Sequence, residues 1–397
     1  LGDVYKRQSL SFPGHLNPLL PYAKVLRDRG HEVRIAAPKA VAEKLQQTGL
    51  AHVAYEDTSY EEIVVAFTGE EGMSEEERQD LSTPRFFVEL LARRALPALR
   101  ETINIWKPDL IVRESCEHAA HIAADEAKVP HFRVAVLNPD NEKKCFKLNA
   151  SAIDDLRETI GLSPDRGASI CLEPVFTAFP AALGETRISN DAPMPFRVQM
   201  PSEEVRADVP TPAWGPRNGE VFLYMTFGTM AGTTDRERAI YRAAIDSVTD
   251  LPVQVLLTTG QNMAEHPLGD IPSNVFVETF GPQAEVLPHA QAVVTHGGAG
   301  TMLGALAAGV PLVIAPMFAD QPDNARSVEA AGAGVAVFEA DSASLRAGIE
   351  NVLNDSDFLV SAQRVSSQMA EMPGIDEAVD ILSLIHISEP TRLDLAS

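Results

Sequence analysis

The chain has 397 residues, of which 45% are hydrophobic and 22% charged, the balance of an ordinary globular protein with room for two domains. Its net charge of −23 disfavours nucleic acid or an anionic membrane as a partner, although a local nest of N–H groups can still bind a nucleotide diphosphate. Three cysteines without metal-ligand spacing, no signal peptide and no apolar run of about 18 residues predict a cytoplasmic protein without membrane insertion. A homodimer is left open.

The two ends of the chain depart from the pattern of the rest. Residues 1–8, LGDVYKRQ, stand where a doubly wound domain should have its first buried strand, and they lack an initiating Met. The tail at 383–397 is equally unlike the sequence before it. Both ends resemble translated adapter sequence, so we interpret them as non-native; genuine but atypical termini are the alternative.

Helical and extended patterns alternate through the first domain, which we assign to residues 1–200. Pro13-Gly14-His15 predicts a turn, and Leu16–Arg29 a helix with Pro18 in its first turn. The other predicted elements are strands at Glu32–Ala37, Ala51–Tyr55, Leu110–Arg113 and His131–Ala135, and helices at Ala40–Gln47, Pro84–Ile105 and Cys116–Lys128. This alternation predicts a parallel sheet with helices on both faces.

Two stretches of the first domain have no clear period. Residues 56–82 are acidic and contain glycine, which predicts a mobile loop rather than a core element. Residues 138–149 do not predict a definite fold. We expect both stretches to supply residues of an acceptor pocket.

Prolines, glycines and charges without an apolar period mark residues 201–220 as an interdomain linker. A second βα series follows at 221–356, and a helical pattern at 357–382. Its predicted strands are Val221–Phe227, Val253–Leu257, Val275–Glu278, Ala292–Thr295, Leu312–Ala315 and Val335–Val337. The last helical patterns are Leu345–Leu353 and Phe358–Leu382. The second domain is therefore also α/β.

The most informative stretch is residues 291–324, QAVVTHGGAGTMLGALAAGVPLVIAPMFADQPDN. A short buried strand ends at Thr295-His296, and a glycine-rich turn leads into a helix. Such a turn aims backbone N–H groups at one point, where the helix dipole favours a negative charge. The predicted phosphate-binding residues are His296, Gly297, Gly298, Gly300 and Thr301.

Three further pairs of residues should lie near this turn. Asp320 and Gln321 follow the next strand, at the edge where open α/β sheets bind ligands. Gly228 and Thr229 follow the first strand of the domain, so their N–H groups can reach a phosphate. Phe280 offers a face for stacking on a pyrimidine, with Gln283 three residues on.

These residues resemble the donor site of the family-one, nucleotide-sugar-dependent glycosyltransferases of GT-B fold, above all the bacterial members that modify macrolides and other natural products. The resemblance extends over about residues 11–382. It implies two doubly wound Rossmann-like domains facing across a cleft, with the last helix returning to the first domain. It also implies that His296 and the glycine turn hold the diphosphate and that Asp320-Gln321 bind the sugar hydroxyls. Phe280 stands where the family has tryptophan.

The same resemblance makes His15 the candidate catalytic base, because it lies in a similar glycine-histidine-x-asparagine-proline pattern. A carboxylate that orients the imidazole would assist it. Glu114 follows a predicted strand where the family normally has aspartate, so its longer side chain leaves the geometry open. Glu117 is a competing partner, and either carboxylate could instead stabilise a helix start.

His118 and His121 could share a helix face, but no third metal ligand stands at a recognisable spacing, so no metal is expected. The predicted reaction is inverting transfer of a sugar from a UDP- or TDP-sugar to a hydroxyl of a hydrophobic natural product, with no other cofactor. Two alternatives are a nucleotide-sugar epimerase of the same fold and a non-catalytic auxiliary partner. His15 argues against the auxiliary, and the Asp320-Gln321 pair argues against the epimerase.

Overall fold

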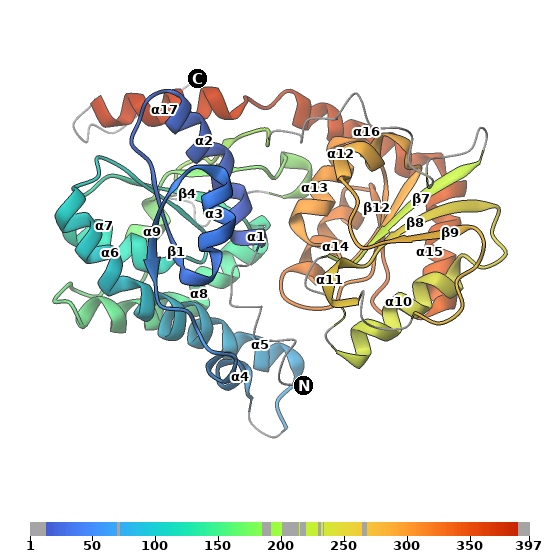
Figure 1. The fold of residues 1–397 in the computed structure, drawn as a ribbon, viewed down its shortest axis with the longest axis horizontal. Coiled ribbons are helices and arrows are strands. Elements are labelled where there is room, and N and C mark those ends of the chain that lie inside the picture. Colours follow the sequence, from blue (N-terminus) through green and yellow to red (C-terminus); the bar gives the residue numbers. More distant parts are fainter. Residues whose placement is uncertain are drawn as a thin grey trace. The chain divides into compact units, whose positions relative to one another are not determined.

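The structure is a computed structural model that describes residues 13–69, 72–184, 192–200, 214, 220–228, 232, 234–263 and 268–387. The residues predicted as a non-native start, 1–8, and all of the predicted linker except Trp214 and Glu220 lie outside this part. The chain divides into two compact units, which are Leu1–Ala178 with Thr186–Pro201 and Pro373–Ser397, and Phe179–Glu185 with Ser202–Met372. Each unit is an α/β assembly of parallel strands, as the sequence predicts (Figure 1).

The first unit contains a two-stranded sheet and a four-stranded sheet among its described residues, in the orders β1-β2 and β3-β4-β5-β6, and all neighbouring strands are parallel. The strands are β1 (Arg34–Pro38), β2 (Ala51–Tyr55), β3 (Ile111–Glu114), β4 (His131–Ala135), β5 (Val175–Thr177) and β6 (Phe196–Arg197). The α-helices are α1 (Pro13–Leu16), α2 (Leu20–Asp28), α3 (Ala42–Thr48), α4 (Tyr60–Phe67), α5 (Glu75–Pro84), α6 (Arg93–Trp106), α7 (His118–Ala127), α8 (Pro139–Glu158), α9 (Ala168–Leu172) and α17 (Ile375–Ile387).

Two predictions for this unit are wrong, and one stretch for which the sequence predicts no definite fold forms a helix. Pro13-Gly14-His15 belongs to the helical turn α1, and a short 3-10 segment at Asn17–Leu19 joins it to α2. The predicted loop at 56–82 contains α4 and most of α5, and each begins with a capping box in which a serine and a glutamate exchange hydrogen bonds. The stretch 138–149 forms the first half of α8, which Asn138 caps.

The second unit has one six-stranded parallel sheet in the order β12-β11-β10-β7-β8-β9. Its strands are β7 (Val221–Thr226), β8 (Val253–Thr258), β9 (Val275–Glu278), β10 (Ala292–Thr295), β11 (Leu312–Ile314) and β12 (Gly334–Ala336). Its helices are α10 (Asp235–Ser247), α11 (Gly260–Met263), α12 (Gln283–Val286), α13 (Ala299–Ala307), α14 (Gln321–Ala330), α15 (Ser342–Asn354) and α16 (Ser356–Ala370). Three strands wind outward from β7 in one direction and three from β10 in the other, the doubly wound Rossmann order.

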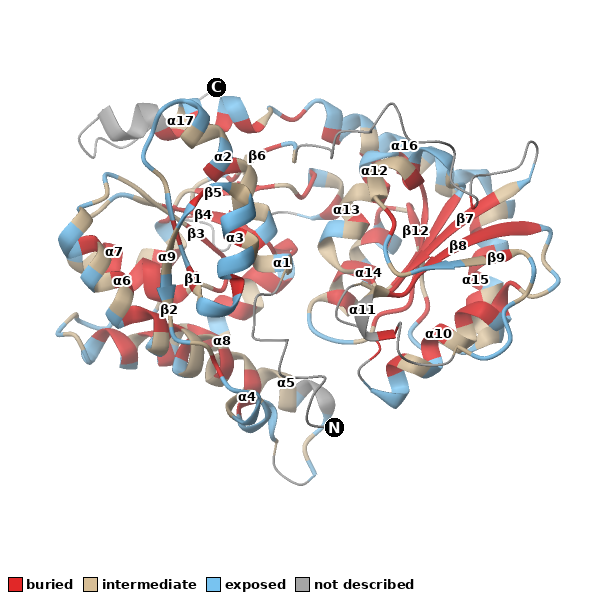
Figure 2. Ribbon diagram, in the orientation of Figure 1, coloured by how far each residue is buried: buried red, intermediate tan, exposed pale blue. Residues whose placement is uncertain are grey.

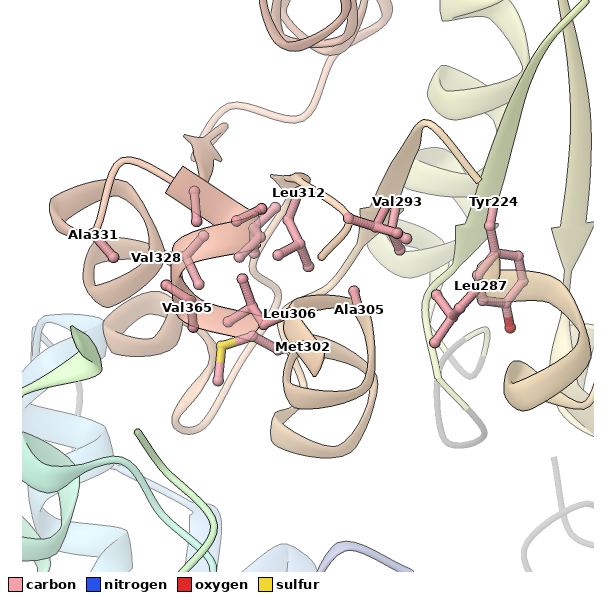
Figure 3. Close-up of a cluster of buried hydrophobic side chains, with 14 of the residues drawn as sticks. Tyr224, Leu287, Val293, Met302, Ala305, Leu306, Leu312, Val328, Ala331 and Val365 are labelled. Carbon is pink, nitrogen blue, oxygen red and sulfur yellow. The ribbon is translucent and has the colours of Figure 1, made fainter. Parts of the chain in front are cut away.

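Both faces of this sheet are buried, which explains why its strands read as continuous apolar runs (Figure 2). Side chains of one strand alternate between two clusters, so that Val293 packs on one face and Val294 on the other. Figure 3 shows the first cluster, where Val293 and Leu312 of the sheet pack near Met302 and Leu306 of α13.

The predicted final helix at Phe358–Leu382 is two helices, α16 and α17, because Pro373 cannot donate the backbone hydrogen bond that would continue the first. α16 belongs to the second unit and α17 to the first. Arg29 ties α17 to α2 through Asp380, with 2.5 Å between Nη1 and Oδ1. Residues 383–387 of the predicted tail lie in α17, and 388–397 lie outside the described part. No helix in the described part is long and apolar enough to cross a membrane.

Candidate active site

The carboxyl ends of β7 and β10 form the topological switch point of the second unit, the place where open α/β sheets bind ligands. The two strands are neighbours in parallel register, with Thr226 opposite Thr295. They therefore end together, and Gly228 and His296 follow them. The sheet order thus joins two motifs that lie far apart in the sequence.

The imidazole of His296 lies between two glycines. A Cβ atom at Gly298 would stand 2.4 Å from His296 Nε2, and one at Gly228 would stand 2.7 Å from the same atom. Gly228 also has a φ of +86°, a backbone conformation that other residues rarely adopt. Both glycines are therefore required for the ring to occupy this position.

His296 is neutral in this position near pH 7. Burial lowers the pKa of His296 to about 4, and a backbone hydrogen bond with Thr226 only partly opposes this effect. Its Nδ1 atom lies 3.1 Å from the Thr295 hydroxyl. A phosphate contact with the neutral ring would therefore be a hydrogen bond rather than an ion pair.

The helix α13 begins directly after the glycines. Its N-cap residue, Gly298, has no side chain to cap the first turn, so the free N–H groups there suit an anion. Gly297 has a φ of +85°, and an added Cβ would lie 2.7 Å from Ile314. The Thr301 hydroxyl accepts a hydrogen bond of 2.9 Å from Gln283 Nε2. This bond connects the residues predicted to bind the phosphates with those predicted to bind the pyrimidine of the nucleotide.

Asp320 ends a tight turn after β11, in which Ala319 has a φ of +57°, and Gln321 begins α14. Gln321 is buried, and its Oε1 atom accepts hydrogen bonds from the backbone of Met317 at 2.8 Å and Phe318 at 3.1 Å. These two bonds orient the side-chain amide; its predicted contact with a sugar hydroxyl stays a prediction. The half-buried Asp320 carboxylate accepts a hydrogen bond of 2.8 Å from Asn324.

Asn324 connects the two halves of the donor motif. Its side chain is fully buried, and its Nδ2 atom donates both to Asp320 Oδ2 and to the carbonyl oxygen of Gly297, each at 2.8 Å. The sequence places Asn324 in the motif without predicting this role. Its position one helical turn after Asp320 is the signal that could have shown it.

Phe280 follows β9, and 68% of its surface is exposed. An aromatic side chain that filled the sheet edge would be buried, so the ring is available for stacking. Thr229 lies outside the described residues, and its predicted contact with phosphate stays a prediction.

The first unit holds the other half of the predicted chemistry. His15 Nδ1 lies 3.1 Å from Glu114 Oε2, and the two side chains are 27% and 10% exposed. The same carboxylate oxygen accepts a hydrogen bond of 2.7 Å from the backbone of Cys116. The longer glutamate side chain therefore reaches the imidazole.

Glu117, the competing partner, has a different position. Its carboxylate caps α7 by accepting hydrogen bonds from Ala119 at 3.2 Å and Ala120 at 2.8 Å. Burial raises the pKa of Glu117 to about 7. Of the two carboxylates, Glu114 is thus the one in contact with His15.

The histidines of α7 are buried among polar side chains. His118 Nε2 lies 3.0 Å from Asn149 Nδ2, and His121 Nδ1 lies 3.1 Å from His131 Nε2. Ligand atoms of His121, His131 and Glu173 lie within 4.8 Å of one another, but the carboxylate of Glu173 is already bound by Arg113. Burial lowers the pKa of His118 and His121 well below the usual range. Chemistry without a metal stays a prediction.

Comparison with known proteins adds an independent observation. Family models described as the N-terminal and C-terminal domains of the erythromycin biosynthesis protein CIII-like proteins match residues 24–152 and 242–385. The chain is 25% identical over 383 residues to NDP-glycosyltransferase YjiC of Bacillus subtilis, covering 92% of this chain and 93% of that protein. It is 28% identical over 422 residues to tylactone mycaminosyltransferase of Streptomyces fradiae, covering 95% and 92%. The crystal structure of the glycosyltransferase SnogD from Streptomyces nogalater has a TM-score of 0.75 and 25% identity, covering 94% of this chain and 96% of that one.

Proposed function

Since the chain belongs to the EryCIII-like family of GT-B glycosyltransferases, it is a glycosyltransferase, and we propose that it transfers a sugar from a UDP- or TDP-sugar to a hydroxyl of a hydrophobic natural product with inversion at the anomeric carbon. The observation that carries this proposal is the contact between His15 and Glu114, together with the two glycines that surround His296 in the second unit. A base and a leaving-group site are what a single displacement requires.

His15 is proposed as the general base. With Nδ1 held by Glu114, Nε2 takes the proton of the acceptor hydroxyl while the acceptor oxygen bonds to the anomeric carbon. The bond between that carbon and the diphosphate oxygen breaks in the same step, so the configuration inverts. The Glu114 carboxylate stabilises the imidazolium that forms.

The departing diphosphate is proposed to bind without a metal. The N–H groups at the start of α13 and the neutral His296 supply hydrogen bonds where negative charge develops. The proposed donor site comprises Gly228, Thr229, Phe280, Gln283, His296, Gly297, Gly298, Gly300, Thr301, Asp320 and Gln321.

An apolar acceptor is favoured by a row of aromatic rings that ends at the proposed base. The centroid of Phe87 lies 5.9 Å from that of His15, Phe86 lies 5.0 Å from Phe87, and Phe67 lies 5.0 Å from Phe86. Tyr60, Val64 and Phe67 share one face of α4, and each is more than two-fifths exposed. Exposed apolar area of this kind often marks a binding surface.

The proposal is tested by incubating the protein with UDP- and TDP-sugars and a panel of ring-containing alcohols. We expect a glycoside whose anomeric configuration, assigned by NMR coupling constants, is opposite to that of the donor. A product with retained configuration would refute the single displacement. A donor converted into its epimer without acceptor would favour the epimerase alternative instead.

A further inference from the structure

Arg113 is a buried, charged residue of the first unit that adjoins the proposed partner of His15. It lies in β3, directly before Glu114, and its side chain is 0% exposed. The sequence predicts a strand at Leu110–Arg113 but not the burial of this charge. Burial of a guanidinium costs free energy unless the group is paired and hydrogen-bonded.

Glu173 neutralises this charge. Arg113 Nε donates to Glu173 Oε1 at 2.9 Å, and Arg113 Nη2 donates to Glu173 Oε2. The Glu173 side chain is also 0% exposed. The two side chains thus form a bidentate pair that fixes the plane of the guanidinium.

The remaining nitrogen of Arg113 binds the turn between β3 and α7. Nη1 lies 3.0 Å from the carbonyl oxygen of Glu114, 3.2 Å from that of Ser115 and 3.3 Å from that of Glu117. This turn carries both the Glu114 side chain and the Cys116 N–H that binds its carboxylate. One guanidinium therefore holds the backbone from which the partner of His15 extends.

We propose that Arg113, oriented by Glu173, is a positioning residue that aims the Glu114 carboxylate at His15; this inference rests on the proposed function of the dyad. Stability alone does not account for the pair, because apolar residues of similar volume often replace a buried ion pair without loss of stability. Apolar residues cannot bind three carbonyl oxygens. Without Arg113 the turn loses the donor that sets its conformation, and the carboxylate is no longer held at 3.1 Å from the imidazole.

The test is the double variant Arg113→Met/Glu173→Met. It removes both charges together, so we expect it to fold and to bind UDP or TDP as the wild type does. We expect kcat to fall about 10–100-fold with little change in the acceptor KM, as for the loss of a supporting contact behind a catalytic group. The ascending limb of the pH–rate profile should also move, because the imidazole has lost its oriented carboxylate.

Three controls separate this role from a structural one. Arg157→Met removes another ion pair of the same unit, between Arg157 and Asp125, and should leave the pH–rate profile unchanged whatever its effect on melting. Arg113→Lys keeps the positive charge but not the planar guanidinium with its several N–H donors, so it should retain only part of the wild-type kcat. In a His15→Ala background the double change should have no further effect on turnover.

Wild-type kcat and pH profile in the folded double variant would overturn the inference. If the double variant does not fold, Arg113→Lys decides: full turnover with an unchanged pH profile overturns the inference, and a reduced kcat with a displaced limb supports it. Failure of the proposed function looks different, because His15→Ala would then keep wild-type turnover.

Discussion

Adding one methyl group at Gly298 should displace His296 and weaken nucleotide binding. The Cβ of Gly298→Ala would lie 2.4 Å from His296 Nε2 and 2.9 Å from Cε1, so the imidazole has to leave its position. Loss of the hydrogen bond between His296 and a phosphate should weaken the binding free energy by about 1–3 kcal/mol. The dissociation constant should then be about 5–150-fold larger. Calorimetry with UDP and TDP measures the change.

Two controls isolate the cause. Gly300→Ala adds the same methyl in the first turn of α13, where nothing lies within 4 Å, so it should leave the melting temperature unchanged or raise it. In a His296→Ala background the ring is absent, so Gly298→Ala should cost little more affinity. Fully additive losses in that double variant, or wild-type affinity in Gly298→Ala, would show that the added methyl does not act through the His296 ring.

Three other predictions follow from burial and exposure. Because burial lowers the pKa of His296 to about 4 in the fold from about 6.5 in the unfolded chain, only the unfolded chain binds the extra proton between these values, and the contribution of His296 to the free energy of unfolding should fall by about 2 kcal/mol from pH 7 to pH 4.5. Urea titrations should show a smaller fall in His296→Gln, and an equal fall would contradict the assignment. Phe280→Ala should weaken nucleotide binding about 2–10-fold at unchanged melting temperature, while Phe280→Trp should keep the wild-type affinity. If Phe280→Ala binds the nucleotide as tightly as the wild type, stacking on Phe280 is excluded. Phe87→Ala should raise the KM of a ring-containing acceptor more than Phe87→Leu does, with nucleotide affinity unchanged, and an unaltered KM would remove Phe87 from the acceptor surface.

The strand, turn and helix that carry the proposed donor site could be predicted from the sequence because their signals are local. A buried strand, a glycine turn and a helix follow one another within residues 291–307, and each element has its own pattern. The bounds of β2, β4, β9 and β10 agree with the sequence prediction to the residue. The contact of Gly228 with His296 depends instead on strand order, which no single segment encodes.

The first unit was harder to predict because two of its helices expose apolar side chains or bury polar ones. On α4 the apolar residues Tyr60, Val64 and Phe67 are exposed, while the start of α8 buries polar residues such as Glu142 and Asn149. Periodicity therefore gave no clear signal in either helix. Capping signals were present, because Ser59 precedes α4 with a glutamate three residues on, and Asn138-Pro139 begins α8. The burial and pairing of Arg113 could not be predicted from the sequence, because its partner Glu173 lies sixty residues away.

In the proposed mechanism His15 acts as the base while the second unit alone binds the nucleotide, and the His15→Ala variant separates these two roles. Single-turnover rates with a saturating donor and an acceptor alcohol should fall about 10²–10⁴-fold, whereas the dissociation constants for UDP and TDP should stay at wild-type values. The rise of the wild-type rate with pH should be absent in the variant. Wild-type turnover in His15→Ala would show that another group is the base.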